Sequence, residues 1–383
     1  MASEADVMSG AHNPTNKSAD HSSHSAGQVT GSDSSIEIRG LYKIFGKRPR
    51  HFMQAVQEGM SKQELQEKHM HVLGLKDINL SMPAGSIQVV MGLSGSGKST
   101  LIRHINRLID PTVGEVIVGG QDVCKMRSTA LRNFRRHETA MVFQKFALLP
   151  HRTVIDNVVY GLEVQGIPRD KQETEARRWI DRVGLSGFED NFPNQLSGGM
   201  QQRVGLARAL TNDAPLLLMD EAFSALDPLI RMDMQTVLLD LQKELHKTIV
   251  FITHDVDEAL RLGDRIAILR DGEIIQEGSG QDIVLEPADE YIQNFVKDVN
   301  RGRVILAESV MKAGAHAQAT VEVAATDHLE AAARLMSDAQ SPAVNVVDSN
   351  GNLVGHLDLE TTVAAIVKQE KRHTSSEGIY SAS

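Results

Sequence analysis

The feature that most constrains this chain is a glycine-rich loop at residues 92–99, with the spacing G-x-x-x-x-G-K-[ST]. A short apolar run at 87–91 predicts a buried strand before it, and apolar residues at helical spacing continue after it until Pro111. A strand, a glycine-rich turn and a helix N-terminus can bind phosphate, because backbone N–H groups and the positive helix end face the anion. Lys98 can then reach the β- and γ-phosphates of a nucleotide, and the Ser99 hydroxyl can ligate Mg²⁺. The loop residues expected to bind ATP are Gly92, Ser94, Gly95, Ser96, Gly97, Lys98, Ser99 and Thr100.

The bulk composition narrows the class of protein. A length of 383 residues allows one large domain with a small one, or two medium domains. Cys124 is the only cysteine, which excludes an intrachain disulfide framework and fits a reducing compartment. No apolar run approaches the roughly eighteen residues of a membrane span, and no signal sequence is evident, so we expect a cytoplasmic protein. The net charge of −10 argues against broad binding to nucleic acid or anionic lipid.

Composition and periodicity divide the chain into four parts. Residues 1–34 carry almost no large apolar side chains, so we expect a disordered leader. Apolar runs alternate with helical patterns over 35–300 and predict an α/β domain on a mainly parallel sheet. A smaller β-α-β unit follows at 306–367, and residues 368–383 form a charged, Ser-rich tail. Within the large domain we expect a helical insertion at about 49–71, a helical subdomain at about 145–212 and a trailing helix to about Val299.

Polar side chains stand at the ends of several predicted strands. Gln144, Asp220 and His254 each follow an apolar run, and Lys98 follows the glycine-rich turn. Ligands of parallel sheets bind at the carboxyl ends of the strands, so we expect these four side chains to converge. A carboxylate at the tip of the apolar run 216–219 needs a cationic partner, and Mg²⁺ would meet Asp220 directly or through water.

Glu221 is the expected catalytic carboxylate. It follows Asp220 and points the other way along the pleat, so it can orient or deprotonate an attacking water; a helix-capping acid is the alternative. His254 could hydrogen-bond the γ-phosphate or the water, although a histidine after a strand is more often structural. Transfer of a phosphoryl group needs positioning, charge neutralisation and an oriented water, and these residue types supply all three.

Three further features have competing interpretations. Phe45, at a strand end before the loop, could stack on an adenine ring, although its spacing alone favours core packing. The basic run 125–137 is expected to form a solvated helix face, with nucleic-acid binding the weaker alternative in an acidic chain. His12, His21 and His24 fit a solvated tail better than a metal site.

Over residues 36–300 the chain resembles the ATPase subunit of an ABC transporter. The resemblance rests on six motifs in a fixed order: the loop 92–99, Gln144, 196–201, 216–221, 224–227 and His254. It implies a P-loop fold of the ABC nucleotide-binding type, with a mainly parallel sheet and a helical subdomain. It also implies an ATPase that converts ATP to ADP and phosphate, uses Mg²⁺, and couples hydrolysis to solute import.

The resemblance assigns roles to individual residues. It implies that Glu221 is the catalytic base, that Gln144 senses the γ-phosphate and that His254 is the switch histidine. It places Phe45 against adenine, contrary to the spacing argument, and forms the Mg²⁺ site from Ser99, Gln144 and Asp220. Because the chain has one phosphate loop and one signature motif, a complete site needs a second copy, head to tail. The residues implied to touch ATP held by that second copy are Leu196, Ser197, Gly198, Gly199, Met200, Gln201 and Asp227.

Within the family, the chain is similar to importers of quaternary-amine osmolytes such as glycine betaine, proline betaine and choline, which serve in osmoprotection. Three stretches carry this similarity: 42–46 with the insertion after it, 141–151, and 219–231. The resemblance implies that the loop near 144–153 receives a membrane permease fed by a periplasmic or extracellular substrate-binding protein, at the inner face of the membrane. The alternatives are another cargo, such as trimethylamine N-oxide or histidine, and a soluble ABC ATPase outside transport.

The C-terminal unit at 306–367 resembles a single CBS motif. Its predicted strands lie near 321–323, 343–348 and 353–357, with a helix between the first two. CBS motifs work in pairs and this chain shows one copy, so pairing with the copy of a second subunit is favoured over ligand binding within one chain. Sensing of ionic strength or of a nucleotide, and simple support of the dimer, are the roles left open.

Overall fold

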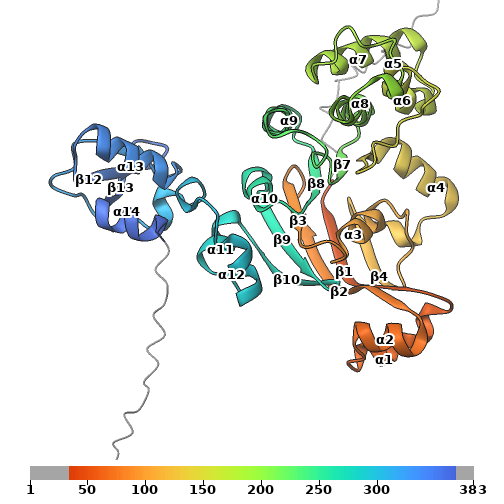
Figure 1. Ribbon diagram of the computed structural model, residues 1–383, viewed down its shortest axis with the longest axis horizontal. Coiled ribbons are helices and arrows are strands. Elements are labelled where there is room, and N and C mark those ends of the chain that lie inside the picture. Colours follow the sequence, from red (N-terminus) through yellow and green to blue (C-terminus); the bar gives the residue numbers. More distant parts are fainter. Residues whose placement is uncertain (1–33, 368–383) are drawn as a thin grey trace, which may run out of the picture. The chain divides into compact units, whose positions relative to one another are not determined.

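The computed structural model describes residues 34–367 (Figure 1). The expectations for the leader and for the tail at 368–383 therefore lie outside the described residues, apart from residue 34. Within the described range no helix is both long enough and apolar enough to cross a bilayer. The large domain contains two sheets, one mainly parallel and one antiparallel.

A six-stranded sheet forms the centre of the large domain, in the order β10-β9-β3-β8-β7-β6. All adjacent pairs are parallel except β9 and β10, which form an antiparallel hairpin. The strands β3, β7 and β8 are buried along their whole length, as expected for strands covered on both faces. The six strands of this sheet are β3 Ile87–Met91, β6 Thr139–Val142, β7 Leu216–Asp220, β8 Thr248–Thr253, β9 Arg265–Arg270 and β10 Glu273–Gly278.

The period-two alternation of these strands divides their side chains between two cores. Val90, Leu218 and Val250 belong to a core shared with the antiparallel sheet and helix α3 (Lys98–Ile105). Their chain neighbours Val89 and Met219 belong to a second core, shared with helices on the other face. These helices are α5 Val154–Val158, α7 Arg169–Arg182, α8 Gly198–Thr211, α9 Pro228–Leu245 and α10 Val256–Leu262, with the short α6 Tyr160–Gln165 beside α8.

The antiparallel sheet has the order β2-β1-β4-β5. Its strands are β1 Ile36–Phe45, β2 Val72–Met82, β4 Val113–Val118 and β5 Gln121–Asp122. The predicted insertion connects β1 to β2 and is helical, with α1 Met53–Gln57 and α2 Lys62–His69. After β5 the basic run forms α4 Ser128–Asn133 and a π-helical turn, in which Arg135 donates hydrogen bonds to the Asn106 and Arg107 carbonyls. The other basic side chains of the run are exposed, as expected for a solvated face, and Arg135 is half-buried.

The expectation of a single trailing helix to about Val299 is wrong. Two short helices occupy this stretch, α11 Gly280–Leu285 and α12 Glu290–Val296. Pro287 lies between them and cannot donate the backbone hydrogen bond that a continuous helix requires. The Asp289 carboxylate then accepts from Ile292 N at 2.9 Å and starts the second helix.

The C-terminal unit has a three-stranded sheet in the order β11-β12-β13. The predicted β-α-β order is confirmed: β11 Glu322–Ala324, α13 Leu329–Asp338 and β12 Ala343–Val347, followed by β13 Leu353–Asp358 and α14 Leu359–Ile366. β11 pairs parallel with β12, and β12 pairs antiparallel with β13. A separate core around Leu329, Val346 and Leu357 holds the unit together.

Candidate nucleotide-binding and hydrolysis site

The glycine-rich loop runs from the end of β3 to the start of α3, and at two of its glycines a side chain would also clash with neighbouring backbone. Gly92 and Gly97 have φ values of 149° and 109°. A Cβ on Gly92 would lie 2.2 Å from the Leu269 carbonyl oxygen, and one on Gly97 would lie 2.7 Å from the Gly74 oxygen. The loop therefore approaches neighbouring backbone so closely that only glycine fits, which brings its N–H groups to one side.

Lys98 is held over this loop. Its Nζ donates hydrogen bonds to the carbonyl oxygens of Gly92 at 2.7 Å and Leu93 at 3.0 Å. Burial lowers the pKa of Lys98, and the carboxylates of Glu221 and Asp220 oppose that shift. The Ser96 hydroxyl is buried and has no hydrogen-bond partner among residues 34–367. A lysine ammonium and an unpaired hydroxyl in one loop suit the oxygens of a phosphate chain.

Asp220 is fully buried at the tip of β7. Ser99 Oγ donates to its Oδ1 at 2.7 Å, and Arg103 Nη2 lies 3.2 Å from its Oδ2. Arg103 is a partner that the sequence argument missed, although its place one helical turn after Ser99 is a usable signal. The hydroxyl and carboxylate oxygens fit a Mg²⁺ ion, which takes few protein ligands and completes its shell with phosphate oxygens and water.

Glu221 has its carboxylate in the cleft rather than in the core. Gln144 Nε2 donates to Glu221 Oε2 at 2.6 Å, and His254 Nδ1 lies 3.8 Å from the same oxygen. The backbone of Glu221 is left-handed, with φ 49°, and its N–H donates to the Ile252 carbonyl at 3.1 Å. Strain of this kind in a residue with a side chain is concentrated at functional sites. Of the four side chains predicted to converge, Lys98, Gln144 and His254 line one cleft together with Glu221, whereas Asp220 is buried and does not line it.

These groups line one cleft of about 550 Å³. Phe45 lines the cleft and is 37% exposed, so the expectation from spacing that it packs in the core is wrong. The Lys43 ammonium lies 5.0 Å from the Phe45 ring centroid, and a Cβ on Gly74 would lie 2.7 Å from the ring. The cleft is lined by Phe45, Lys62, Val72, Leu73, Gly74, Leu93, Ser94, Gly95, Gly97, Lys98, Ser99, Thr100, Gln144, Glu221 and His254.

The signature residues do not line this cleft in the part of the chain that the structure describes. Ser197 and Gly198 are exposed at the start of α8, where Met200 N donates to Ser197 Oγ at 3.3 Å. Asp227 is exposed immediately before α9 and makes no capping hydrogen bond through its side chain. Leu196 is buried, and its carbonyl accepts a hydrogen bond from Gln201 Nε2 at 3.2 Å. The exposed members of the motif are thus free to contact another molecule.

Comparison with known proteins places these motifs in a family. A family model described as ABC transporter matches residues 75–224, which include the glycine-rich loop, the signature motif and Asp220–Glu221. Three relatives are similar over most of the chain. The glycine betaine transport ATP-binding protein OpuAA of Bacillus subtilis (strain 168) is 51% identical over 277 residues, 72% of this chain and 66% of that protein.

The other two relatives align over a longer part of the chain. The glycine betaine/proline betaine transport system ATP-binding protein ProV of Escherichia coli (strain K12) is 42% identical over 335 residues, 88% of this chain and 83% of that protein. The trimethylamine N-oxide transport system ATP-binding protein TmoW of Pelagibacter ubique (strain HTCC1062) is 41% identical over 342 residues, 89% of this chain and 100% of that protein.

Among solved structures, the fold is similar to the ATP-binding cassette MJ0796, in the dimeric structure of a post-hydrolysis state bound to ADP and Pi. The TM-score is 0.56 and the sequence identity 32%, covering 64% of this chain and 98% of that chain.

Proposed function

Because the chain belongs to the family of ABC transporter ATP-binding proteins, we propose that it hydrolyses ATP to power import of glycine betaine or a related betaine. The observation that carries the ATPase part is the convergence of Lys98, Ser99 and Glu221 on one cleft, with the buried Asp220 carboxylate hydrogen-bonded to Ser99. The cargo is inferred from relatives that are named for glycine betaine transport.

The cleft geometry supports a division of labour among its residues. Lys98 and the loop N–H groups hold the β- and γ-phosphates, while Phe45 stacks on the adenine ring. Mg²⁺, when bound by Ser99, Gln144 and Asp220 oxygens, would neutralise phosphate charge. Glu221 accepts a proton from the attacking water as the oxygen of that water approaches the γ-phosphorus.

Gln144 and His254 act around that carboxylate. Both are near Glu221 Oε2, at 2.6 Å for Gln144 Nε2 and 3.8 Å for His254 Nδ1. Gln144 lies at the start of the loop that follows β6, so its contact with the γ-phosphate would make that loop respond to ATP. His254 donates a hydrogen bond to the γ-phosphate and thereby stabilises the charge on its oxygens.

A second copy of the chain completes the site. The exposed positions of Ser197, Gly198 and Asp227, away from the cleft of their own chain, support their use against ATP bound by a partner. Moving such a pair from mostly open to mostly closed needs about 5.5 kcal/mol of differential binding. Charge-assisted contacts to two γ-phosphates are of the kind that can supply it.

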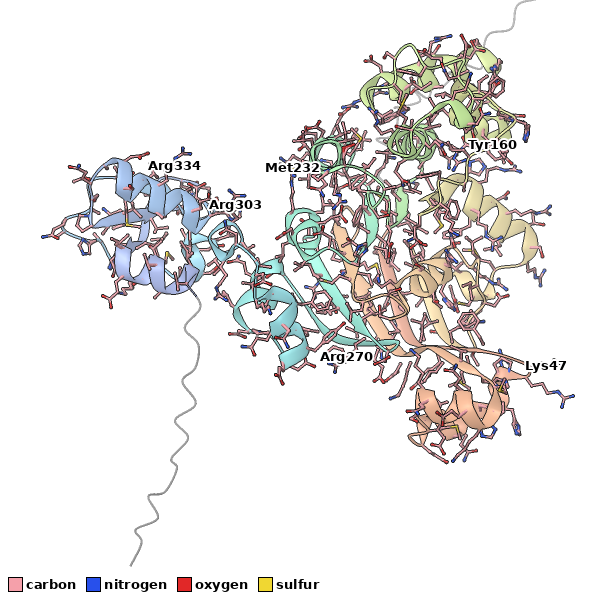
Figure 2. All side chains as sticks on the ribbon, in the orientation of Figure 1. Lys47, Tyr160, Met232, Arg270, Arg303 and Arg334 are labelled. Carbon is pink, nitrogen blue, oxygen red and sulfur yellow. The ribbon has the colours of Figure 1, made fainter. Side chains whose placement is uncertain are left out.

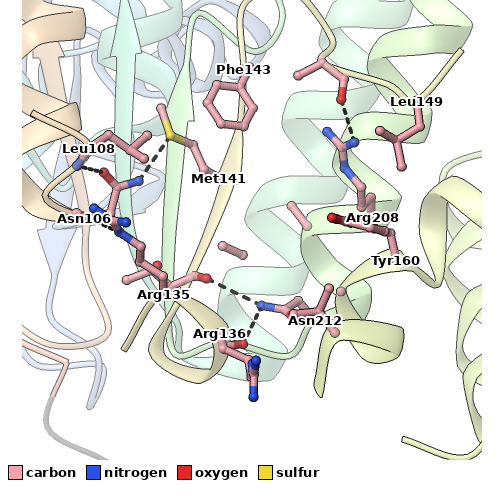
Figure 3. A pocket seen from close by; sticks show the side chains of 16 residues that line it. Asn106, Leu108, Arg135, Arg136, Met141, Phe143, Leu149, Tyr160, Arg208 and Asn212 are labelled. Atoms are coloured by element: carbon pink, nitrogen blue, oxygen red, sulfur yellow. Dashed lines mark hydrogen bonds between the residues drawn. The ribbon is translucent and has the colours of Figure 1, made fainter. Parts of the chain in front are cut away.

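An apolar pocket beside the same loop supports docking of a helix from a permease (Figure 3). It has a volume of about 380 Å³, and Leu108, Tyr160 and Val164 are exposed in its wall. Arg208 donates hydrogen bonds to the carbonyls of Ala147 at 2.8 Å and Phe146 at 3.1 Å. The pocket thus shares a loop with Gln144, so a permease bound there at the inner face of the membrane would sense ATP.

The C-terminal unit is proposed to be a CBS-like module that pairs with its copy in the second subunit. It is attached to α11, because Leu285 packs against its core and Gln281 Oε1 accepts from Leu306 N at 3.1 Å. Sensing and dimer support both remain compatible with this arrangement.

Trimethylamine N-oxide is a second candidate cargo, since a relative named for its transport is 41% identical over 89% of this chain.

One experiment tests both the transport role and the cargo. Tagged Glu221→Gln protein is recovered from detergent-solubilised host membranes with ATP and Mg²⁺, and its companions are identified by mass spectrometry. We expect a multi-span permease, whose companion binding protein is then titrated with glycine betaine, choline and trimethylamine N-oxide. Recovery of ribosomal or DNA-repair proteins alone would overturn the transport role.

A further inference from the structure

The insertion between β1 and β2 has no part in the chemistry described above, yet it is a well-packed unit (Figure 1). Its own core contains Met53, Val56 and Leu65, which pack with Ile44 and Leu73 of the two strands. Ser61 starts α2 by accepting a hydrogen bond from Glu64 N at 3.1 Å. The insertion therefore has a fixed structure at the end of the hairpin.

His71 locks the insertion to the hairpin. Its ring nitrogens lie 2.6 Å from the His69 carbonyl oxygen and 2.7 Å from the Lys47 carbonyl oxygen. A Cβ on Gly46 would lie 2.2 Å from the same ring, so the ring fills the space that glycine leaves. The side chain of Lys47 itself is exposed and extends away from this contact (Figure 2). The position of α2 relative to β1 is thus set from both ends of the insertion.

This anchoring places Lys62, the first residue of α2, in the wall of the nucleotide cleft. Phe45 and Val72 line the same cleft, and Lys62 is the only lysine besides Lys98 among the cleft-lining residues that the structure describes. Its Nζ is 3.4 Å from Asp271 Oδ1, and about a third of its side chain, 34%, is exposed.

Asp271 belongs to the turn between β9 and β10. The next residue, Gly272, donates its N–H to the Ser96 carbonyl of the phosphate loop at 2.9 Å. The Lys62 ammonium therefore contacts an exposed carboxylate in a turn whose backbone is hydrogen-bonded to the phosphate loop, while the Lys62 side chain itself lines the cleft. At 3.4 Å its contact with Asp271 is long for a charge-assisted hydrogen bond, so other acceptors can compete for it.

We infer that Lys62 is a nucleoside-binding residue: its ammonium donates to acceptor atoms of the ribose or adenine while Phe45 stacks on the base. This inference rests on the proposed binding of ATP in this cleft. Asp271 competes with the nucleotide for the same ammonium group. The insertion thus contributes a charged side chain to the cleft that Phe45 and Lys98 also line.

Direct titration of three variants with ATP and with inorganic tripolyphosphate tests the inference. Lys62→Met should weaken ATP binding about fivefold, as expected for loss of one partly exposed charged donor, and leave tripolyphosphate binding unchanged. Asp271→Asn should tighten ATP binding, because it removes the competitor. Lys68→Met is the matched control, since Lys68 is on the same helix, exposed, and paired with Glu64 outside the cleft. Lys62→Arg should retain most of the affinity.

Two results would overturn the inference. Equal weakening of ATP binding by Lys62→Met and Asp271→Asn would mean that the ion pair only supports the insertion. Equal weakening of ATP and tripolyphosphate binding by Lys62→Met would place the ammonium on the phosphates instead. Wild-type protein that binds ATP without hydrolysing it would contradict the proposed function and leave this binding test intact.

Discussion

Glu221 follows a fully buried aspartate, yet its own carboxylate lies in the open cleft. The left-handed backbone at φ 49° produces this change of direction within one residue, and Gln144 fixes the result with a 2.6 Å hydrogen bond. The surrounding structure maintains this strained residue, because Glu221 is hydrogen-bonded to Ile252 of β8 and to Gln144 in the loop after β6.

Replacement of Glu221 by Gln should therefore leave ATP binding intact and slow hydrolysis. The amide oxygen can still accept from Gln144, so the geometry is kept while the base is lost. We expect kcat to fall about 100-fold or more, the contribution usual for a general base. A stopped assay for released phosphate, combined with titration of ATP, separates the two effects. Turnover near the wild-type rate would remove Glu221 from the catalytic role.

His104 is a buried histidine whose titration affects the stability of the fold. Its ring is completely buried on α3, with Nδ1 donating to the Thr100 carbonyl at 2.7 Å and Nε2 without a partner among the described residues. Burial lowers the pKa of His104 from 6.5 to about 4. The folded protein thus keeps the ring neutral, whereas the unfolded chain takes up a proton below about pH 6.5.

The stability that His104 contributes is complete above pH 6.5 and declines as the pH falls toward 4. We expect a loss of about 2 kcal/mol in the free energy of unfolding between pH 7.5 and 5 from this residue. His104→Met removes the titration and should lose correspondingly less over the same range. Urea unfolding of both proteins at several pH values measures the difference. Parallel pH profiles would show that the buried ring does not control acid stability.

At the scale of elements, the alternation of apolar runs and helical patterns was enough to predict the parallel sheet and the side of it that carries the site. Lys98, Asp220 and His254 could be placed because strand ends in such a sheet converge. The pairing of Arg103 with Asp220 and the exposure of Phe45 depend on packing between distant segments, which local periodicity does not encode. The break at Pro287 was visible in the sequence, but the apolar pattern on both sides concealed it.

The phosphate loop gives an element-scale prediction about glycine. Gly97→Ala should abolish ATP binding and destabilise the fold by more than its backbone strain alone, because the new Cβ would lie 2.7 Å from the Gly74 oxygen. Gly59→Ala is the matched control: its φ of 108° is nearly that of Gly97 at 109°, yet nothing lies within 4 Å of a Cβ there. The control should cost about 1–2 kcal/mol of backbone strain. Equal losses in urea unfolding, with ATP binding retained in both variants, would contradict the steric argument.

At the scale of the whole molecule, the cleft and the signature residues proposed to complete it lie on different surfaces of one chain. The cleft holds the phosphate loop and Glu221, while Ser197 and Asp227 are exposed elsewhere. We propose that a head-to-tail pair of identical chains resolves this separation, because each phosphate loop would then meet the signature of the other copy. The exposed pocket beside the Gln144 loop and the C-terminal unit would let a permease and a second module act on the same equilibrium.

The most direct test of this account mixes two inactive variants. Lys98→Ala removes the phosphate-loop lysine, and Ser197→Arg blocks the signature. Both sites of each homodimer are therefore inactive. A mixed pair contains one intact site, formed by the loop of the Ser197→Arg chain and the signature of the Lys98→Ala chain. An equimolar mixture should therefore recover up to about a quarter of wild-type ATP turnover. A mixture as inactive as either variant alone would contradict the shared site, provided that both variants are folded and still associate with each other.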